Sequence, residues 1–346
     1  MYHHLNRVIW ILLVSLMVLS TTSRAQDSPF KQEQVQFANG AVSLSGTLML
    51  PSSEGPFPAV VYLHGSGPMT RAGFEPYAEA FARMGVASLF YDKRGTGSST
   101  GSWVSSSLDD LAGDALAAIR HLRTDKRIDG NRIGFWAISQ GGWIAPRAAA
   151  QSDDVAFMMV ISGGGATPRE SEIYSYRNEF DHAGLSEAEK SEGFDLLNGY
   201  FDYLATGKGR PELAQRLQAM EANHDSQLYL LAQQISRILP SAENRPNWSW
   251  VANYDPAPDI AKVKGPVLVM FGDQDQEAPP EQSVKRWREG LKASGNQDST
   301  IMVFPGAGHG IRMGRHSANG KRPPFADGYR EAMLGWLWLH VVNQGD

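Results

Sequence analysis

Residues 134–143 read G-F-W-A-I-S-Q-G-G-W, and this stretch sets a single hydroxyl group between an apolar run and two glycines. The apolar residues before Ser139 are typical of a buried strand. The glycines after it are typical of a bend too tight for a Cβ atom. We therefore expect Ser139 at a sharp turn between a strand and a helix, with its hydroxyl held within reach of another molecule. Its use as a nucleophile depends on a base, an acid and an oxyanion site supplied from elsewhere in the chain.

Apolar runs and helical patterns alternate along most of the chain. An alternating pattern around Asn39-Gly40 predicts a β-hairpin over residues 35–51. Buried strands are expected at 59–63, 86–91, 131–138, 155–161, 267–271 and 300–304, and helices at 76–83, 108–123, 143–150 and 325–342. Strands that alternate with helices pair in parallel, because each crossover requires a helix. The sequence thus predicts an α/β fold with a mostly parallel sheet.

The alternation is interrupted by a polar, helical segment at about residues 166–261. Ser186 and Glu189 have the spacing of a capping box, and no long strand pattern occurs there. We interpret residues 166–261 as a helical insertion at the strand-end side of the sheet. The sheet domain is then expected to consist of residues 26–165 and 262–346.

Composition narrows the class of protein. Hydrophobic residues make up 42% of the 346 residues, which is enough for a sizeable core. The formal net charge of −5 is mild and gives no reason to expect nucleic acid or an anionic membrane surface as a partner. Because the chain has no cysteine, disulfides, thiolate metal sites and a cysteine nucleophile are all excluded.

The first 25 residues have the layout of a cleaved secretory signal peptide. A basic start precedes the apolar run Val8–Leu19, and small residues follow at Ser23 and Ala25. That run is too short to span a hydrocarbon core of about 30 Å. We expect a mature protein that begins near Gln26, is secreted or periplasmic, and keeps no stable membrane span. An uncleaved membrane anchor is the alternative.

Polar residues with catalytic potential follow the expected strands. Ligands of open α/β sheets bind at the carboxyl ends of the strands, so these residues are expected to converge. In chain order they are His64-Gly65-Ser66-Gly67, Asp92 and Arg94, Ser139, Asp273 and Asp275, and His309. A serine, a carboxylate and a histidine thus occur in the order Ser, Asp, His along one edge of the sheet.

Five motifs, each following an expected strand, resemble the α/β-hydrolase superfamily. They are H-G-S-G-P (64–68), D-K-R-G-T-G-S-S (92–99), A-I-S-Q-G-G-W (137–143), F-G-D-Q-D-Q-E-A-P-P (271–280) and G-A-G-H-G (306–310). The chain from about Val35 onward is most similar to exported serine esterases, next to the dienelactone-hydrolase and prolyl-oligopeptidase-like groups. The resemblance implies an α/β-hydrolase fold with a helical cap insertion. Ala137 departs from the pattern, because it stands where the nucleophile elbow usually has its first glycine.

The resemblance implies a catalytic triad of Ser139, His309 and Asp275. A serine hydroxyl is a poor nucleophile until a base accepts its proton. His309 is flanked by glycines directly after a strand, which favours it over His316 in a polar stretch. The acid holds the histidine in the correct tautomer and stabilises the imidazolium. Asp275 has the family's position, whereas Asp273, the alternative, has the character of a turn-forming aspartate.

The resemblance also implies an oxyanion hole made of backbone N–H groups. One is the N–H of Gln140, directly after the nucleophile, and the other is the N–H of Ser66. In this family the loop with Asp92 and Arg94 mainly braces the end of the sheet, so a structural role is expected for both.

The sequence predicts no cofactor and no metal. G-T-G-S-S-T-G at 95–101 has its third glycine misplaced for a dinucleotide loop and lacks the downstream acid. No H-E-x-x-H motif or Cys/His cluster suggests a metal site. Five aromatic residues flank the insertion, and they either line an acyl pocket or form the insertion's own small core: Tyr174, Tyr176, Trp248, Trp250 and Tyr254.

The expected protein is therefore a carboxylesterase-type serine hydrolase that cleaves small-molecule esters through an acyl-enzyme intermediate. A serine peptidase is one alternative, since the same groups cleave amides, and an acyltransferase is another. A non-catalytic binding protein on a hydrolase scaffold is a third alternative, although such chains usually lose a catalytic residue. Acyl and alcohol specificity and the oligomeric state are not predicted.

Overall fold

The computed structural model describes residues 29–224, 226–314 and 322–343. The expected signal peptide, residues 1–25, lies outside the described residues, and so does His316. Both predictions therefore stay untested. Within the described part of the chain, no helix combines the length and the apolar character that crossing a membrane requires.

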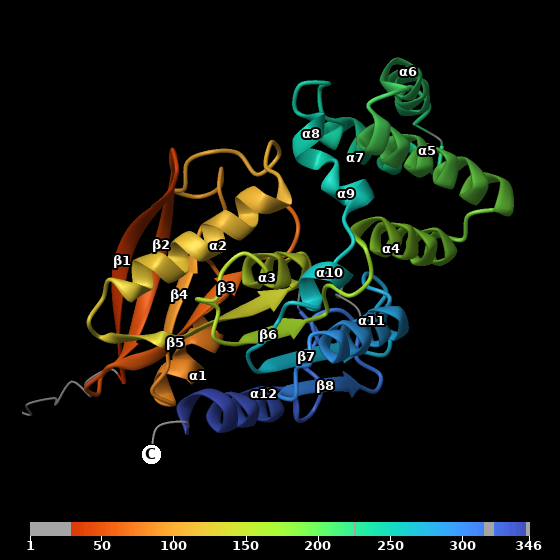
Figure 1. Ribbon diagram of the computed structural model, residues 1–346. Helices are drawn as coiled ribbons and strands as arrows, with labels where there is room; N and C mark the ends of the chain where they lie inside the picture. The colour runs from red at the N-terminus through yellow and green to blue at the C-terminus, as the bar shows by residue number, and fades with distance from the viewer. Residues whose placement is uncertain (1–28, 225, 315–321, 344–346) are drawn as a thin grey trace, which may run out of the picture.

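A single eight-stranded sheet forms the centre of the described structure (Figure 1). Its strands lie in the order β1-β2-β4-β3-β5-β6-β7-β8; β1, β2 and β4 are antiparallel neighbours, and all later pairings are parallel. The strands are β1 (Phe30–Asn39), β2 (Val42–Pro51), β3 (Phe57–Leu63), β4 (Ala87–Tyr91), β5 (Ile128–Ile138), β6 (Met158–Ile161), β7 (Val267–Gly272) and β8 (Ser299–Phe304). The prediction of a mostly parallel α/β sheet is confirmed.

The N-terminal hairpin closes at the predicted position. Asn39 pairs with Val42, which leaves Gly40 and Ala41 as a two-residue loop. Gly40 has a φ of +58°, a left-handed conformation that costs glycine little and most other residues more. The turn residues therefore set the register of β1 on β2.

Helices cover both faces of the sheet (Figure 1). On one face, α2, α3, α10 and α11 pack on a cluster that includes Leu116, Ile144, Ile260 and Trp287. On the other face, α1, α12 and the π-helical turn η1 pack around Trp136. These helices are α1 (Glu75–Arg83), α2 (Leu108–Arg123), α3 (Gly141–Ala149), α10 (Ala257–Ile260), α11 (Pro280–Ala293), α12 (Tyr329–Leu337) and η1 (Trp338–Val342).

The segment between β6 and β7 is helical and builds a hydrophobic cluster of its own, which we call the cap core. It includes Phe180, Leu196, Phe201, Leu217 and Ile235. Its helices are α4 (Pro168–Ala183), α5 (Glu187–Thr206), α6 (Arg210–Glu221), α7 (Tyr229–Ile238), α8 (Arg245–Trp248) and α9 (Trp250–Asn253). In Figure 1 these helices project from the strand-end side of the sheet. The domain boundaries at 165/166 and 261/262 stay a prediction.

Capping boxes begin the first two helices of this segment. The Ser186 side chain accepts from the backbone N–H of Glu189, and the Glu189 carboxylate accepts from the backbone N–H of Ser186. Thr167 and Glu170 repeat the arrangement at the start of α4. The reciprocal bonds satisfy donors that a helix start otherwise leaves unpaired, so they fix where each helix begins.

Helix α11 is not among the elements expected from the sequence. Most of its surface is charged, and only a narrow apolar stripe, Val284, Trp287 and Leu291, packs toward the sheet. The indole of Trp287 is fully buried and donates to the carbonyl of Gly163 at 3.1 Å. This crossover lets β7 and β8 lie parallel, so it helps to place the residues that follow both strands.

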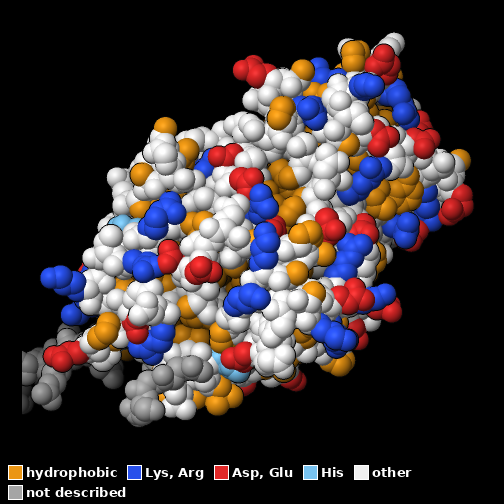
Figure 2. All heavy atoms as spheres, viewed as in Figure 1, with side chains coloured by type: hydrophobic (Ala, Val, Ile, Leu, Met, Phe, Trp, Pro, Cys, Tyr) orange, Lys and Arg blue, Asp and Glu red, His pale blue; other side chains and the backbone are white. Residues whose placement is uncertain are grey.

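The surface carries charges of both signs. Figure 2 shows Lys, Arg, Asp and Glu side chains interspersed over one face of the sheet domain and of the cap helices. That distribution agrees with the mild net charge of −5. This face therefore offers a mixed rather than a single-signed field to a partner.

Candidate active site

Ser139 stands at the turn between β5 and α3, in a strained backbone conformation. Its φ is +54°, which non-glycine residues seldom adopt. Two backbone bonds hold it there: the Ser139 N–H donates to the carbonyl of Ile161 at 3.0 Å, and the N–H of Gly142 donates to the Ser139 carbonyl at 2.8 Å. This strand–turn–helix geometry is that of a nucleophile elbow.

Close backbone approach explains the glycines around the elbow. A Cβ placed on Gly142 would lie 2.3 Å from the carbonyl carbon of Gly163. A Cβ placed on Gly163 would lie 2.1 Å from the backbone carbonyl oxygen of Ser139. Ala137 is fully buried, and its methyl group fits because Gly141 has no side chain: a Cβ on Gly141 would lie 3.2 Å from it. The departure at Ala137 is thus accommodated by the fold.

Asp275 and His309, which follow β7 and β8, are brought into direct contact. The Nδ1 atom of His309 lies 3.0 Å from Oδ2 and 3.1 Å from Oδ1 of Asp275. Asp275 is 1% exposed, and its Oδ1 also accepts the backbone N–H groups of Glu277 and Ala278, each at 2.9 Å. These two bonds hold the carboxylate so that Oδ2 faces the imidazole.

Asp273, the alternative acid, and His64 are not part of the contact between Asp275 and His309. Asp273 is exposed, and its Oδ1 accepts the N–H of Gly306 at 2.7 Å, a loop-bracing role. His64 is buried between the rings of Phe74 and Tyr91. Burial, together with the nearby charge of a lysine, lowers the pKa of His64 to about 3, so this imidazole stays neutral.

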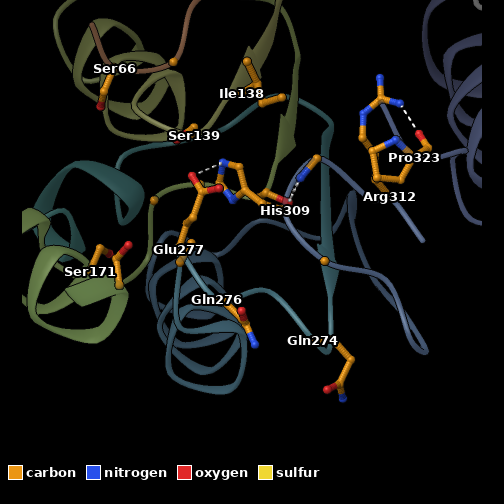
Figure 3. A pocket seen from close by; sticks show the side chains of 18 of the residues that line it. Ser66, Ile138, Ser139, Ser171, Gln274, Gln276, Glu277, His309, Arg312 and Pro323 are labelled. Atoms are coloured by element: carbon orange, nitrogen blue, oxygen red, sulfur yellow. Dashed lines mark hydrogen bonds and ion pairs between the residues drawn. The ribbon is translucent and has the colours of Figure 1, made fainter. Parts of the chain in front are cut away.

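A cavity of about 980 Å³ is lined by some of the predicted site residues, but not by Asp275 or Gln140 (Figure 3). Ser66, Ser139 and His309 all line it. Among the described residues, no hydrogen bond joins the Ser139 hydroxyl to His309; instead, Nε2 of His309 lies 3.5 Å from Oε2 of Glu277. Catalytic hydrogen bonds are often long before substrate binds and shorten in the complex. The structure therefore brings the expected acid and base into direct contact, and the expected nucleophile lines the same cavity as the base.

The two expected oxyanion donors are free to bind a ligand. Among the described residues, the N–H groups of Gln140 and Ser66 donate to no protein acceptor. Gln140 is the N-cap residue of α3, and Ser66 lies in the exposed loop after β3. Unpaired N–H groups at a helix start are suited to an anion.

Two opposing effects act on the protonation of His309. Burial of the imidazole disfavours its charged form, but the hydrogen bond and charge of Asp275, and then the charge of Glu277, outweigh burial and raise the pKa of His309 above its ordinary value. Because a general base must be neutral before it accepts a proton, activity is expected to fall at low pH as His309 becomes protonated.

Replacing Glu277 by glutamine tests this account. The change removes a negative charge 3.5 Å from Nε2, so it lowers the pKa of His309 and moves the acid limb of kcat/KM to lower pH. The measurement is the pH profile of kcat/KM, with Glu281→Gln, an exposed carboxylate in the first turn of α11, as the control. An acid limb that stays in place or moves to higher pH would contradict the account.

Asp92 and Arg94 brace loops and do not line the cavity. The carboxylate of Asp92 accepts the backbone N–H groups of Arg71 at 2.9 Å and Ser98 at 3.0 Å. The Arg94 guanidinium makes a bidentate pair with Asp114, with both contacts at 2.7 Å. These contacts agree with the structural role expected from the sequence.

Ser162 contributes to the site, although sequence reasoning did not single it out. It directly follows β6, is fully buried with a φ of +49°, and its hydroxyl accepts the N–H of Gly310 at 3.0 Å. It therefore holds the loop that carries His309. The available signal was S-G-G-G after an expected strand, the same strand-end position that drew attention to Ser139.

Two carboxylates in the cavity wall were also missed. Glu172 on α4 and Glu277 line the cavity, and Arg312 and Arg322 line it as well. Burial, and then the charge of Glu277, raises the pKa of Glu172 to about 7. The sequence offered no signal for Glu172, since its helix meets the cavity only through tertiary packing.

The flanking aromatic residues do not line this cavity. Tyr176, Trp248 and Trp250 pack against the cap core, and Trp250 and Tyr254 also pack against the sheet's core. The hydroxyl of Tyr174 donates to the carbonyl of Asp275 at 2.9 Å. Of the two interpretations, these contacts favour the one in which the aromatic residues are structural.

No metal-binding cluster occurs in the part of the chain that the structure describes: no group of three or more His, Cys, Asp or Glu side chains is suited to hold an ion.

Comparison with known proteins places these features in a family. The family described as X-Pro dipeptidyl-peptidase (S15 family) matches residues 39–309. The quorum-quenching protein AidA of Acinetobacter baumannii is 27% identical over 322 residues, covering 89% of this chain and 91% of AidA. The esterase EstD of Thermotoga maritima is 24% identical over 273 residues, covering 77% of this chain and 57% of EstD.

Solved structures share the fold at low sequence identity. The Pyrococcus furiosus esterase Pf2001 has a TM-score of 0.60 and 17% identity, over 91% of this chain and 93% of that one. The Pyrococcus horikoshii acylaminoacyl peptidase has a TM-score of 0.58 and 19% identity, over 92% of this chain and 43% of that one. The expected α/β-hydrolase fold is confirmed.

Proposed function

The chain belongs to the X-Pro dipeptidyl-peptidase (S15) family and is a hydrolase, and from this we propose that it cleaves carboxylic esters of small molecules as a serine hydrolase. One observation carries the proposal: Ser139 and His309 line one cavity, and Asp275 contacts His309. Among the described residues, the backbone N–H groups of Ser66 and Gln140 also have no protein acceptor. The names of EstD and Pf2001, both esterases, add support.

The first step forms an acyl-enzyme. The Ser139 oxygen attacks the ester carbonyl carbon while Nε2 of His309 accepts the hydroxyl proton, and the carbonyl oxygen becomes an oxyanion between the N–H groups of Ser66 and Gln140. Asp275 accepts the Nδ1 hydrogen and stabilises the imidazolium. His309 then gives its proton to the leaving alcohol oxygen as the carbon–oxygen bond breaks.

The second step releases the acid. Water attacks the acyl carbon, His309 accepts a proton from that water, and the proton passes to the Ser139 oxygen as it leaves. Glu277 attracts His309 only in its charged form, because a carboxylate repels the Nε2 lone pair of the neutral ring. Glu277 therefore does not hold the neutral ring, and the Nε2 lone pair stays available to the Ser139 proton.

One feature of the cavity favours a second candidate function, the hydrolysis of amides that bear a free amino group. Glu172 and Glu277 both line the cavity, and Glu277 lies beside His309. The charge of Glu277, and that of Glu172 in its ionised form, would attract a protonated amine on a substrate in this cavity. The peptidase description of the family agrees with this candidate.

A matched substrate panel separates the two candidates. Nitrophenyl esters of increasing acyl length are compared with the same esters bearing an α-amino group, and with aminoacyl nitroanilides, using wild type and Ser139→Ala. Ester hydrolysis that depends on Ser139 and needs no amino group supports the esterase proposal. A preference for aminoacyl nitroanilides over simple esters would overturn it. If the amine is recognised, Glu172→Gln should lower kcat/KM for amino substrates alone.

Export is part of this proposal. The signal-like layout of residues 1–25 supports a secreted or periplasmic enzyme. Expression of the full chain, followed by N-terminal sequencing of the extracellular or periplasmic fraction, tests it; a chain that begins near Gln26 is expected. An uncleaved chain in the membrane fraction would support the anchor alternative.

A further inference from the structure

Lys93 is a buried cation next to the candidate oxyanion site. It lies between Asp92 and Arg94, directly after β4, and is 3% exposed. Among the described residues, no carboxylate forms an ion pair with its ammonium group, whereas Arg94 has Asp114. A buried charge without a counter-ion is costly unless hydrogen bonds compensate it, so the partners of Lys93 indicate what it does.

The ammonium has three oxygen partners. Nζ donates to the carbonyl of Gly65 at 2.8 Å, to the carbonyl of Gly67 at 3.2 Å and to Oε1 of Gln140 at 2.6 Å. An ammonium has three N–H donors and no acceptor, so each proton finds one oxygen. Burial lowers the pKa of Lys93 to about 7. A neutral amine would have two donors only and would turn a lone pair toward an oxygen, which opposes deprotonation.

These three oxygens belong to the two segments that supply the oxyanion donors. Gly65 and Gly67 flank Ser66 on both sides, and Gln140 bears the other donor on its own backbone. We propose that Lys93 is a positioning residue that holds the backbone N–H groups of Ser66 and Gln140 at the spacing a tetrahedral oxyanion requires. This inference rests on the proposed serine-hydrolase function.

The loop that carries Ser66 needs such an anchor. Ser66 is exposed, and Gly67 has a φ of +86°, so this stretch has few packing contacts and a glycine with wide conformational freedom. The backbone N–H of Lys93 also donates to the carbonyl of Met69 at 3.1 Å. Lys93 therefore holds residues 65–69 through its backbone and its side chain. Oxyanion donors act at 2.7–3.1 Å from the oxyanion, so a small displacement of either N–H group lowers kcat.

The first test is Lys93→Met, which keeps the apolar stem and removes the ammonium. Loss of an oxyanion donor typically costs about 10²–10³ in kcat, so a fall of about 10² with KM nearly unchanged is expected. A trifluoromethyl ketone, which forms a tetrahedral adduct with a catalytic serine, should lose affinity by a similar factor. Hydrogen exchange of residues 64–69 should accelerate, a readout that needs no turnover.

Two further variants keep the test decisive if Lys93→Met folds poorly. Gln140→Met removes one partner of Nζ but leaves the backbone N–H, and it should lower kcat by about tenfold with KM unchanged. Lys264→Met is the matched control. Nζ of Lys264 also donates to a backbone carbonyl, that of Ser294 at 2.8 Å, but Lys264 does not line the cavity. Its kcat should equal that of wild type.

The outcomes separate this inference from the proposed function. Activity that survives in Ser139→Ala would overturn the proposed function, and the role of Lys93 with it. If activity depends on Ser139 but Gln140→Met and folded Lys93→Met keep wild-type kcat, the inference alone is overturned. A rise in KM with kcat unchanged would also overturn it, because that pattern indicates lost ground-state binding rather than lost transition-state stabilisation.

Discussion

Replacement of Ser139 or His309 by alanine is expected to lower kcat by about 10⁶, and the double variant should be no slower than either single one. The serine cannot attack without a base to accept its proton, and the base has nothing to activate without the serine. The two side chains therefore act as one unit, and the loss of either removes the whole contribution. The measurement is kcat at a saturating ester concentration, calculated per mole of folded protein.

The control for this pair is His121→Ala. His121 lies on α2, stacks on the ring of Phe37 at a centroid distance of 5.6 Å and does not line the cavity. Its removal is expected to change stability slightly and turnover hardly at all. If the losses from Ser139→Ala and His309→Ala instead multiplied in the double variant, the two residues would be acting independently, and the proposed mechanism would be wrong.

Asp275→Asn is expected to lower kcat by about 10⁴ near neutral pH. Oδ1 of Asp275 accepts the backbone N–H groups of Glu277 and Ala278, so the amide oxygen of asparagine should stay at that position. Its NH₂ group then takes the place of Oδ2, 3.0 Å from Nδ1 of His309, and donates to that nitrogen. The imidazole is forced to carry its proton on Nε2, where it cannot accept one from Ser139.

Asp273→Asn is the matched control for this variant. Asp273 is exposed, and its Oδ1 accepts the N–H of Gly306, a bond that an asparagine oxygen can also make. Turnover should stay within a few-fold of wild type. Equal losses in the two variants would remove Asp275 from the mechanism, and a larger loss in Asp273→Asn would assign the acid to the alternative residue.

Several elements could be predicted because their signals are local. Leu108–Arg123 was expected as a helix over the same residues that the structure gives, since apolar residues recur at helical spacing and Ser107 caps the start with Asp110. The buried run before Ser139 and the glycines after it indicated the elbow in the same way. Hydrophobic periodicity and turn chemistry act over a few residues, so they can be recognised in a single sequence.

Other features could not be predicted because they depend on sparse apolar residues or on contacts between residues far apart in the sequence. Helix α11 presents a narrow apolar stripe among charged residues, which a count of hydrophobic residues does not detect. Lys93 stood between two charged neighbours in a loop, and nothing local indicated that its ammonium meets Gly65 and Gln140. Glu172 lies on a helix of the insertion, far in sequence from every motif, and reaches the cavity only through the packing of α4 against the sheet domain.

The amino-acid sequence by itself determined the alternation of strands and helices, the sharp turn at Ser139, and which residue types follow each strand. The resemblance of the motifs favoured Asp275 over Asp273, and the tertiary structure shows the contact of Asp275 with His309. Tertiary structure alone decided what Lys93 binds, and that Glu172 and Glu277 share a cavity with Ser139. The physical reason is the separation along the chain over which each kind of interaction acts. Backbone propensities and turn geometry depend on neighbours along the chain, whereas hydrogen bonds and charge interactions between distant side chains depend on how the strands are ordered and the helices packed.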